Sequence, residues 1–157
     1  MLLVNASKGR SAIHGFGLIA GEPIRRGTII LRHRPGFDLE LTDEQVAALS
    51  PISRFQVLHY GCRDASQSRH FVPSDDGRFI NHSEFPNSGP LPDGEGPSPP
   101  WSVAALHNIA PGEEITLDYR AQGCSIDFAH WDEFASPRSS SGASPSRAQA
   151  RRAARNR

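Results

Sequence analysis

Short apolar runs, separated by glycine and proline, dominate the hydrophobic pattern of this chain. Five runs of apolar or β-branched residues are predicted to be strands: Leu2 to Asn5, Gly17 to Ala20, Thr28 to Leu31, Ser102 to His107 and Ile115 to Tyr119. Pro23 and Gly27 mark a turn between the second and third runs, and Pro111 and Gly112 mark another before the last. Short strands joined by such turns indicate a mostly β domain.

A small helical insert, roughly Asp38 to Arg69, interrupts the strand pattern. Thr42 and Gln45 have the spacing of a capping box ahead of an apolar face, and Pro51 is predicted to stop this first helix. A second helix is predicted from Ser53 to Tyr60. The insert therefore adds two short helices to the β domain.

The last residues differ in composition from the rest. Residues 136–157 hold six of the 17 basic residues, none of the 17 acidic ones and no large apolar side chain. Such a segment cannot bury enough surface to offset its ordering entropy, so we expect one domain over 1–135 and a disordered Arg/Ser/Ala-rich tail over 136–157. The tail is either a solvated arm or a weak contact for nucleic acid or an acidic protein surface. Residues 88–100, rich in proline and glycine, are predicted to form a loop.

Several classes of protein are disfavoured. The apolar run Met1 to Val4 is too short for a signal peptide and no stretch is long enough to span a bilayer, so we expect no membrane contact and a cytoplasmic location, or a nuclear one in a eukaryote. Cys62 and Cys124 form no CxxC pair and no histidines have HExxH spacing, which argues against a disulfide scaffold and predicts no metal site.

Three motifs carry the candidate chemistry. The first is His14-Gly15-Phe16-Gly17, where two glycines let the backbone approach a ligand closely; an ordinary turn also fits. The second places Asn81-His82-Ser83 directly after apolar Phe79-Ile80, so hydrogen-bonding side chains end a buried segment; a capped turn with a structural histidine also fits.

The third motif is a tight turn that leads into a strand. It contains Glu113-Glu114 and closes on Asp118-Tyr119. An edge hairpin with an interfacial tyrosine would have the same pattern. Each motif alone is therefore weak, and their order along the chain is what makes them informative.

Taken together, the three motifs closely resemble the SET-domain family of lysine methyltransferases, over about Ser7 to Tyr119. The shared pattern also includes Ile24 and the turn glycine Gly27, and Pro86-Asn87 after the second motif. The resemblance implies a β-clip-like fold of short strands with a small helical insert and a C-terminal pseudoknot. It also implies S-adenosylmethionine as the cofactor.

The resemblance assigns a role to particular residues. It implies that Tyr119 is catalytic, and that the cofactor is bound by His14, Gly15, Phe16, Gly17, Asn81, His82 and Tyr119. Many relatives close the cofactor site with a zinc-binding cysteine cluster after the catalytic tyrosine, which this chain lacks. We expect Trp131 to cover the adenine instead, although a hydrophobic clasp on the core is an equal alternative. Tyr60 either lines a lysine channel or packs in the core.

Two functions follow from the resemblance. The first is an S-adenosylmethionine-dependent methyltransferase that acts on a lysine side chain of a protein substrate, whose identity the sequence does not reveal. The second is a catalytically silent SET module that binds a partner protein, because a fold by itself does not establish activity.

Overall fold

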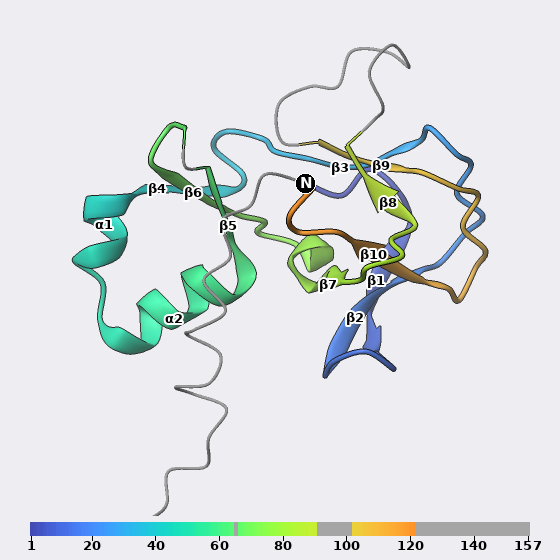
Figure 1. The fold of residues 1–157 in the computed structure, drawn as a ribbon, viewed down its shortest axis with the longest axis horizontal. Helices are drawn as coiled ribbons and strands as arrows, with labels where there is room; N and C mark the ends of the chain where they lie inside the picture. Colours follow the sequence, from blue (N-terminus) through green and yellow to red (C-terminus); the bar gives the residue numbers. More distant parts are fainter. Residues whose placement is uncertain (65, 91–101, 122–157) are drawn as a thin grey trace, which may run out of the picture.

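The computed structural model of the chain describes residues 1–64, 66–90 and 102–121 (Figure 1). Its strands are β1 (Ala6–Arg10), β2 (Phe16–Ala20), β3 (Ile29–Arg32), β4 (Leu39–Thr42), β5 (Cys62–Asp64), β6 (Arg69–Val72), β7 (Asn81–His82), β8 (Ser88–Gly89), β9 (Ser102–Ala105) and β10 (Glu114–Leu117). Its helices are α1 (Asp43–Ala47), α2 (Pro51–Tyr60) and the 3₁₀ helix η1 (Asp76–Phe79). The predicted mostly β architecture with a small helical insert is confirmed.

Two sheets make up this described part. The larger sheet runs in the order β1-β2-β10-β8-β9-β3, and β7 also pairs with β10. The smaller sheet has the order β4-β6-β5 and lies with α1 and α2 on one side of the molecule (Figure 1). The core belongs to the larger sheet, where Leu18, Ile30, Val103 and Ile115 are buried together.

Strand β10 joins parts of the chain that are far apart in sequence. It is antiparallel to β2 on one side and parallel to β7 and β8 on the other. Thr116 lies opposite Asn81, and Leu117 lies opposite His82. Asn87 adds side-chain bonds, accepting from the Thr116 N–H at 2.8 Å. All three sequence motifs therefore meet around this strand, in the knot-like arrangement predicted for the C-terminal part.

The predicted first strand, Leu2 to Asn5, is wrong. The strand is the polar segment Ala6–Arg10, paired along its length with β2. Leu2 makes only an isolated bridge to Leu31, and it packs with Val4 against the core. An edge strand that is largely exposed does not need apolar alternation, so its sequence carried no strand signal.

The capping box of α1 is confirmed. Thr42 Oγ1 accepts a hydrogen bond from the Gln45 N–H at 3.2 Å, and Gln45 Oε1 accepts one from the Thr42 N–H at 2.8 Å. Pro51 does not stop this helix; it opens α2, two residues before the predicted start, with Ser50 as the N-cap. Proline suits the first helical position because the missing N–H would have no partner there.

The small sheet of the insert was not predicted, because its strands are short and mostly polar. Asp43, at the start of α1, holds it together by accepting from Arg63 Nε at 3.0 Å and Nη2 at 2.6 Å, and by pairing with His70 Nε2 at 2.9 Å. The Arg63 bonds, aided by His70, lower the pKa of Asp43 to about 2. Cys62, at the start of β5, is disulfide-bonded. With two cysteines in the sequence this is at most one cross-link, and not the disulfide scaffold that the sequence argues against.

Several predictions fall outside the described residues. They concern Trp131, the domain end at residue 135, the tail 136–157 and most of the loop 88–100; the first two residues of that loop form β8. No helix in the described ranges is long and apolar enough to cross a membrane.

Because Gly17 of β2 has no side chain, the carboxylate of Glu114 in β10 can pack directly against its backbone. A Cβ added to Gly17 would lie 2.1 Å from Glu114 Oε1 and 2.6 Å from its Cδ. Both distances are far below van der Waals contact, so no larger residue fits while Glu114 stays in place. The second glycine of the first motif is therefore explained by packing against the third motif.

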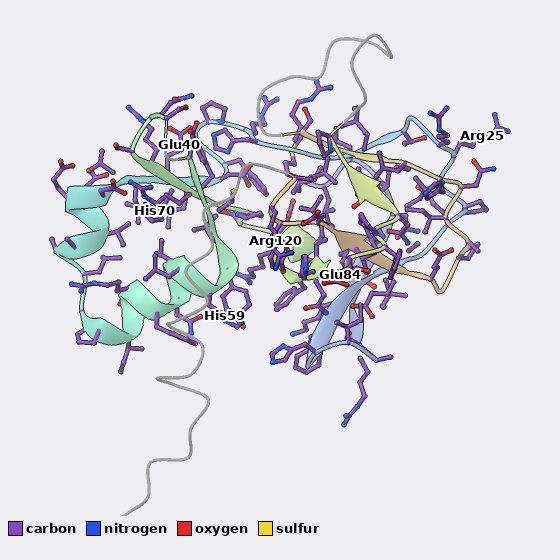
Figure 2. All side chains as sticks on the ribbon, in the orientation of Figure 1. Arg25, Glu40, His59, His70, Glu84 and Arg120 are labelled. Carbon is purple, nitrogen blue, oxygen red and sulfur yellow. The ribbon has the colours of Figure 1, made fainter. Side chains whose placement is uncertain are left out.

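We expect Asp43→Asn to destabilise the fold at neutral pH, because it removes the carboxylate that pairs with Arg63 and His70. The pKa of Asp43 is lowered to about 2 when folded, against about 3.9 for an unfolded aspartate. Its contribution is thus present above about pH 4 and is lost as the pH falls toward 2. Melting temperatures of wild type and variant should converge over that window. Glu84→Gln, at an exposed carboxylate beyond β7 (Figure 2), is the control and should show no such convergence.

We expect Gly17→Ala to cost about 1–3 kcal/mol of unfolding free energy, the usual penalty of overpacking. The clash is with Glu114, so the penalty should be much smaller in a Glu114→Ala background. Urea denaturation of the two single variants and the double variant measures this coupling. Equal costs in both backgrounds would contradict the proposed contact.

Candidate active site

Tyr119 lies just beyond the end of β10, where the chain leaves the sheet. Its ring is partly buried against the core, and its hydroxyl donates a hydrogen bond to the Ile80 carbonyl at 2.6 Å. Burial raises the pKa of Tyr119 to about 12, so the phenol keeps its proton at physiological pH. With that proton engaged by Ile80, the hydroxyl oxygen still has lone pairs that can accept.

His82 lies behind Tyr119 and fixes its backbone. Tyr119 N–H donates to His82 Nδ1 at 3.4 Å, and the two rings are 5.3 Å apart. His82 Nδ1 is also 3.8 Å from Asp118 Oδ1. Because β7 runs parallel to β10 and His82 lies opposite Leu117, the last residue of that strand, His82 is placed beside Asp118 and Tyr119, which follow it.

Asn81 binds the loop that contains the first motif. Its side-chain amide lies 2.9 Å from the Phe16 carbonyl, 3.2 Å from the His14 carbonyl and 2.8 Å from Glu114 Oε1. The Glu114 carboxylate also accepts from Ser11 Oγ at 2.8 Å. These hydrogen bonds fix the backbone of residues 14–16 beside Asn81, where it stays accessible to a ligand.

One cavity, which we call the motif cavity, is formed by the motifs themselves. It is lined by His14, Gly15, Phe16, Asn81 and Tyr119, and also by Arg78 and Phe79 of η1. Cations surround its aromatic rings. Lys8 Nζ lies 5.0 Å from the centre of the Phe16 ring and 5.2 Å from that of Phe79, and the Arg78 guanidinium lies 5.3 Å from the Phe79 ring.

A second cavity, which we call the apolar cavity, adjoins the first. Its walls are mostly apolar and include Leu31, Leu58, Phe71, Val103 and Leu117. Five residues line both cavities: His59, Tyr60, Arg78, Ile80 and Tyr119. The two spaces therefore meet at the candidate catalytic tyrosine, between the end of α2 and the end of β10.

The structure brings most of the predicted site residues together. His14, Gly15, Phe16, Asn81 and Tyr119 line the motif cavity, whereas Gly17 and His82 do not. Gly17 is buried against Glu114, and His82 supports Tyr119 from behind. Both residues therefore lie beside the motif cavity and not in its lining, and their contacts with the cofactor stay predictions.

Sequence reasoning missed several lining residues. Arg78 and Phe79 belong to the same stretch of sequence as Asn81, three and two positions before it, so their place in the second motif was a signal that went unused. His59 reaches the site from the insert, and no local pattern indicated this. Tyr60 lines both cavities, as one of its two predicted roles required. Among the described residues no cluster of histidine, cysteine or acidic side chains could hold a metal.

Comparisons with known proteins identify the fold and the family. The family model of the SET domain matches residues 15–120. A proposed histone methyltransferase of Plasmodium falciparum has a TM-score of 0.51 at 20% identity, covering 75% of this chain and 95% of that one. A chain of the Chaetomium thermophilum Polycomb Repressive Complex 2, a humanized mutant bound to an inhibitor, has a TM-score of 0.52 at 18% identity.

A third similar structure is KRYPTONITE in complex with DNA, an H3(1–15) peptide and SAH, with a TM-score of 0.50 at 22% identity. This chain covers only 15% of the Polycomb chain and 24% of KRYPTONITE, while 74% and 75% of its own length are matched. The family model, which spans Gly15 to the residue after Tyr119, decides the assignment: the chain belongs to the SET-domain family of methyltransferases.

Proposed function

We propose that this chain is an S-adenosylmethionine-dependent methyltransferase that modifies a lysine side chain of a protein. The observation that carries the proposal is the meeting of two unlike cavities at Tyr119. One is polar and surrounded by motif residues, and the other is mostly apolar. Transfer of a group between two substrates needs such a pair of sites, because each substrate must be bound separately while their reacting atoms meet at one point.

The motif cavity has the chemistry to hold the cofactor. Gly15 has a φ of +51° and no atom within 4 Å of an added Cβ, so the backbone there is open to a ligand. Arg78 offers a cation to a carboxylate, and the exposed face of Phe16 offers a surface to a base. When bound, S-adenosylmethionine supplies a methyl group activated by its sulfonium.

The apolar cavity suits the acceptor lysine. A free lysine has a pKa of about 10.4, so deprotonating it at pH 7 costs roughly 4–5 kcal/mol. When the lysine amine is buried between Leu31, Leu58 and Leu117, the charged ammonium is disfavoured and the cost of deprotonation falls. The cavity thus both selects a long aliphatic side chain and prepares its amine.

Tyr119 supplies polar contacts at the junction of the cavities. Its hydroxyl proton is given to the Ile80 carbonyl, so its oxygen can accept weak CH···O contacts from a polarised methyl group. Its pKa of about 12 means that it neither gives nor takes a proton at neutral pH. We therefore assign it an orienting role at the reacting carbon.

Calorimetry with S-adenosylmethionine, followed by transfer of tritiated methyl to a panel of basic proteins, tests the proposal. The H3(1–15) peptide present in the KRYPTONITE structure belongs in that panel. We expect binding and transfer to lysine. Absence of both would favour the rival function, a silent module that binds a partner protein.

We expect Tyr119→Phe to lower turnover by a factor of about 10² while leaving the dissociation constant for S-adenosylmethionine nearly unchanged, because the lost hydroxyl acts at the reacting carbon. Single-turnover kinetics and calorimetry measure the two quantities. Tyr60→Phe is the matched control, since it removes a hydroxyl from the same cavities. Equal losses in both variants would show that general polarity, and not Tyr119, is responsible.

A further inference from the structure

Lys8 lies in the middle of β1, in the hairpin that β1 forms with β2 (Figure 1), and it is the only lysine in the sequence. Its Nζ is 5.0 Å from the ring centre of Phe16 and 5.2 Å from that of Phe79. Phe16 belongs to the first sequence motif and Phe79 precedes the second, and both rings line the motif cavity. Lys8 is not part of that lining, so it contacts two walls of the cavity from outside.

The backbone of Lys8 is fixed against both of these walls. It pairs with Leu18 in β2, the strand that begins at Phe16. Its N–H donates to Asp76 Oδ2 at 3.0 Å, and Asp76 begins η1, which ends at Phe79. The side chain is therefore anchored where it reaches both rings.

The ammonium of Lys8 has aromatic partners in place of an acidic one. In the parts of the chain that the structure describes, it forms no ion pair with a carboxylate. An ammonium within about 6 Å of a ring centre is attracted by the negative face of the ring. One ammonium shared by two rings therefore turns a face of each ring toward itself.

Phe16 depends on this contact more than Phe79 does. Phe79 also meets the ring of Tyr60 at 5.6 Å and the guanidinium of Arg78 at 5.3 Å. Phe16 is 55% exposed, and Lys8 makes its only cation–π or ring contact within the described ranges. Exposed side chains with few neighbours exchange rapidly between rotamers. The ammonium of Lys8 thus favours the rotamer in which Phe16 lines the motif cavity.

We propose that Lys8 is a positioning residue of the cofactor site, whose ammonium holds the ring of Phe16 where the purine of the cofactor packs against it. This inference rests on the function proposed above. Lys8 covers one face of the ring and leaves the opposite face for the purine. Because the ring is already ordered, less conformational entropy is lost when the ligand binds. In this role Lys8 acts through Phe16 and does not itself bind the cofactor.

The first test is a double-variant cycle measured by calorimetry with SAH, which has no charge on sulfur and so avoids repulsion between cations. We expect Lys8→Met, which keeps the aliphatic stem and removes the charge, to weaken binding about fivefold. Lys8→Arg keeps a cation over the ring and should bind within about twofold of wild type. In a Phe16→Leu background Lys8→Met should have no further effect, because the ring that it holds is gone. Equal losses in the two backgrounds would overturn the proposal.

Binding of 5′-methylthioadenosine, measured by competition with SAH, separates packing of the purine from attraction of the carboxylate. This compound keeps the purine and lacks the amino-acid end. We expect Lys8→Met to weaken its binding by the same factor as that of SAH. A loss seen only with SAH would show that Lys8 attracts the carboxylate, and it would contradict the positioning role. Arg10→Met, which removes a positive charge from the end of the same strand, is the control and should bind both compounds as wild type does.

Because Lys8 is the only lysine, the charge can also be removed from the folded wild-type protein. Acetic anhydride acetylates the Lys8 amine and the α-amino group, and mass spectrometry of the peptide that contains Lys8 measures the extent. Acetylated wild type should bind SAH as Lys8→Met does. In Lys8→Arg only the α-amino group is acetylated, so the reagent should leave its affinity unchanged. This comparison decides the matter if Lys8→Met does not fold.

The outcomes separate this inference from the proposed function. Wild type that binds SAH, with equal affinity after acetylation and in Lys8→Met, contradicts only the role of Lys8. Wild type that binds neither S-adenosylmethionine nor SAH contradicts both.

Discussion

The carboxylate of Glu114 is the contact on which the rest of the site depends. It lies against Gly17, accepts from Ser11, and pairs with the amide of Asn81. These partners come from the loop before β2, from β2 itself and from β7. A partly buried carboxylate needs donors to offset its lost hydration, so this one group fixes three segments relative to one another. The open backbone at residues 14–16 and the placement of Tyr119 both follow from that order.

The distribution of charge around the two cavities is uneven. Arg78 and Lys8 sit at the aromatic rings of the motif cavity, whereas the only described carboxylate that lines either cavity is Asp38, on the apolar side. A zwitterionic ligand is therefore oriented by its carboxylate, which Arg78 attracts, while no anion competes for its positive centre. The neutral Tyr119 fits this pattern, since an ionised phenolate there would bind an ammonium and hold it charged.

The sequence predicted best where local chemistry and spacing agree. The capping box at Thr42 and the three motifs were recognised because each uses residues whose geometry is set within a few positions of one another. It predicted the first strand badly, since Lys8 and its neighbours form an edge that owes its pairing to β2 and not to its own pattern. The position of His59 in the cavity walls could not be predicted, and Tyr60 was predicted only as one of two alternatives, because both depend on how the insert packs against a sheet whose other members are distant in the chain.

The place of β10 in the larger sheet has a consequence for how the protein is made. The bonds that Glu114 makes span 33 residues to Asn81 and 103 residues to Ser11. While the ribosome is still adding the residues before β10, β2 has only β1 beside it and β7 has no partner strand, so the edges that β10 will cover are open to other chains. Such high contact order slows folding and postpones closure of the sheet until β10 has been synthesised. Binding of a chaperone to the nascent chain would therefore matter most during the interval before residue 117 emerges.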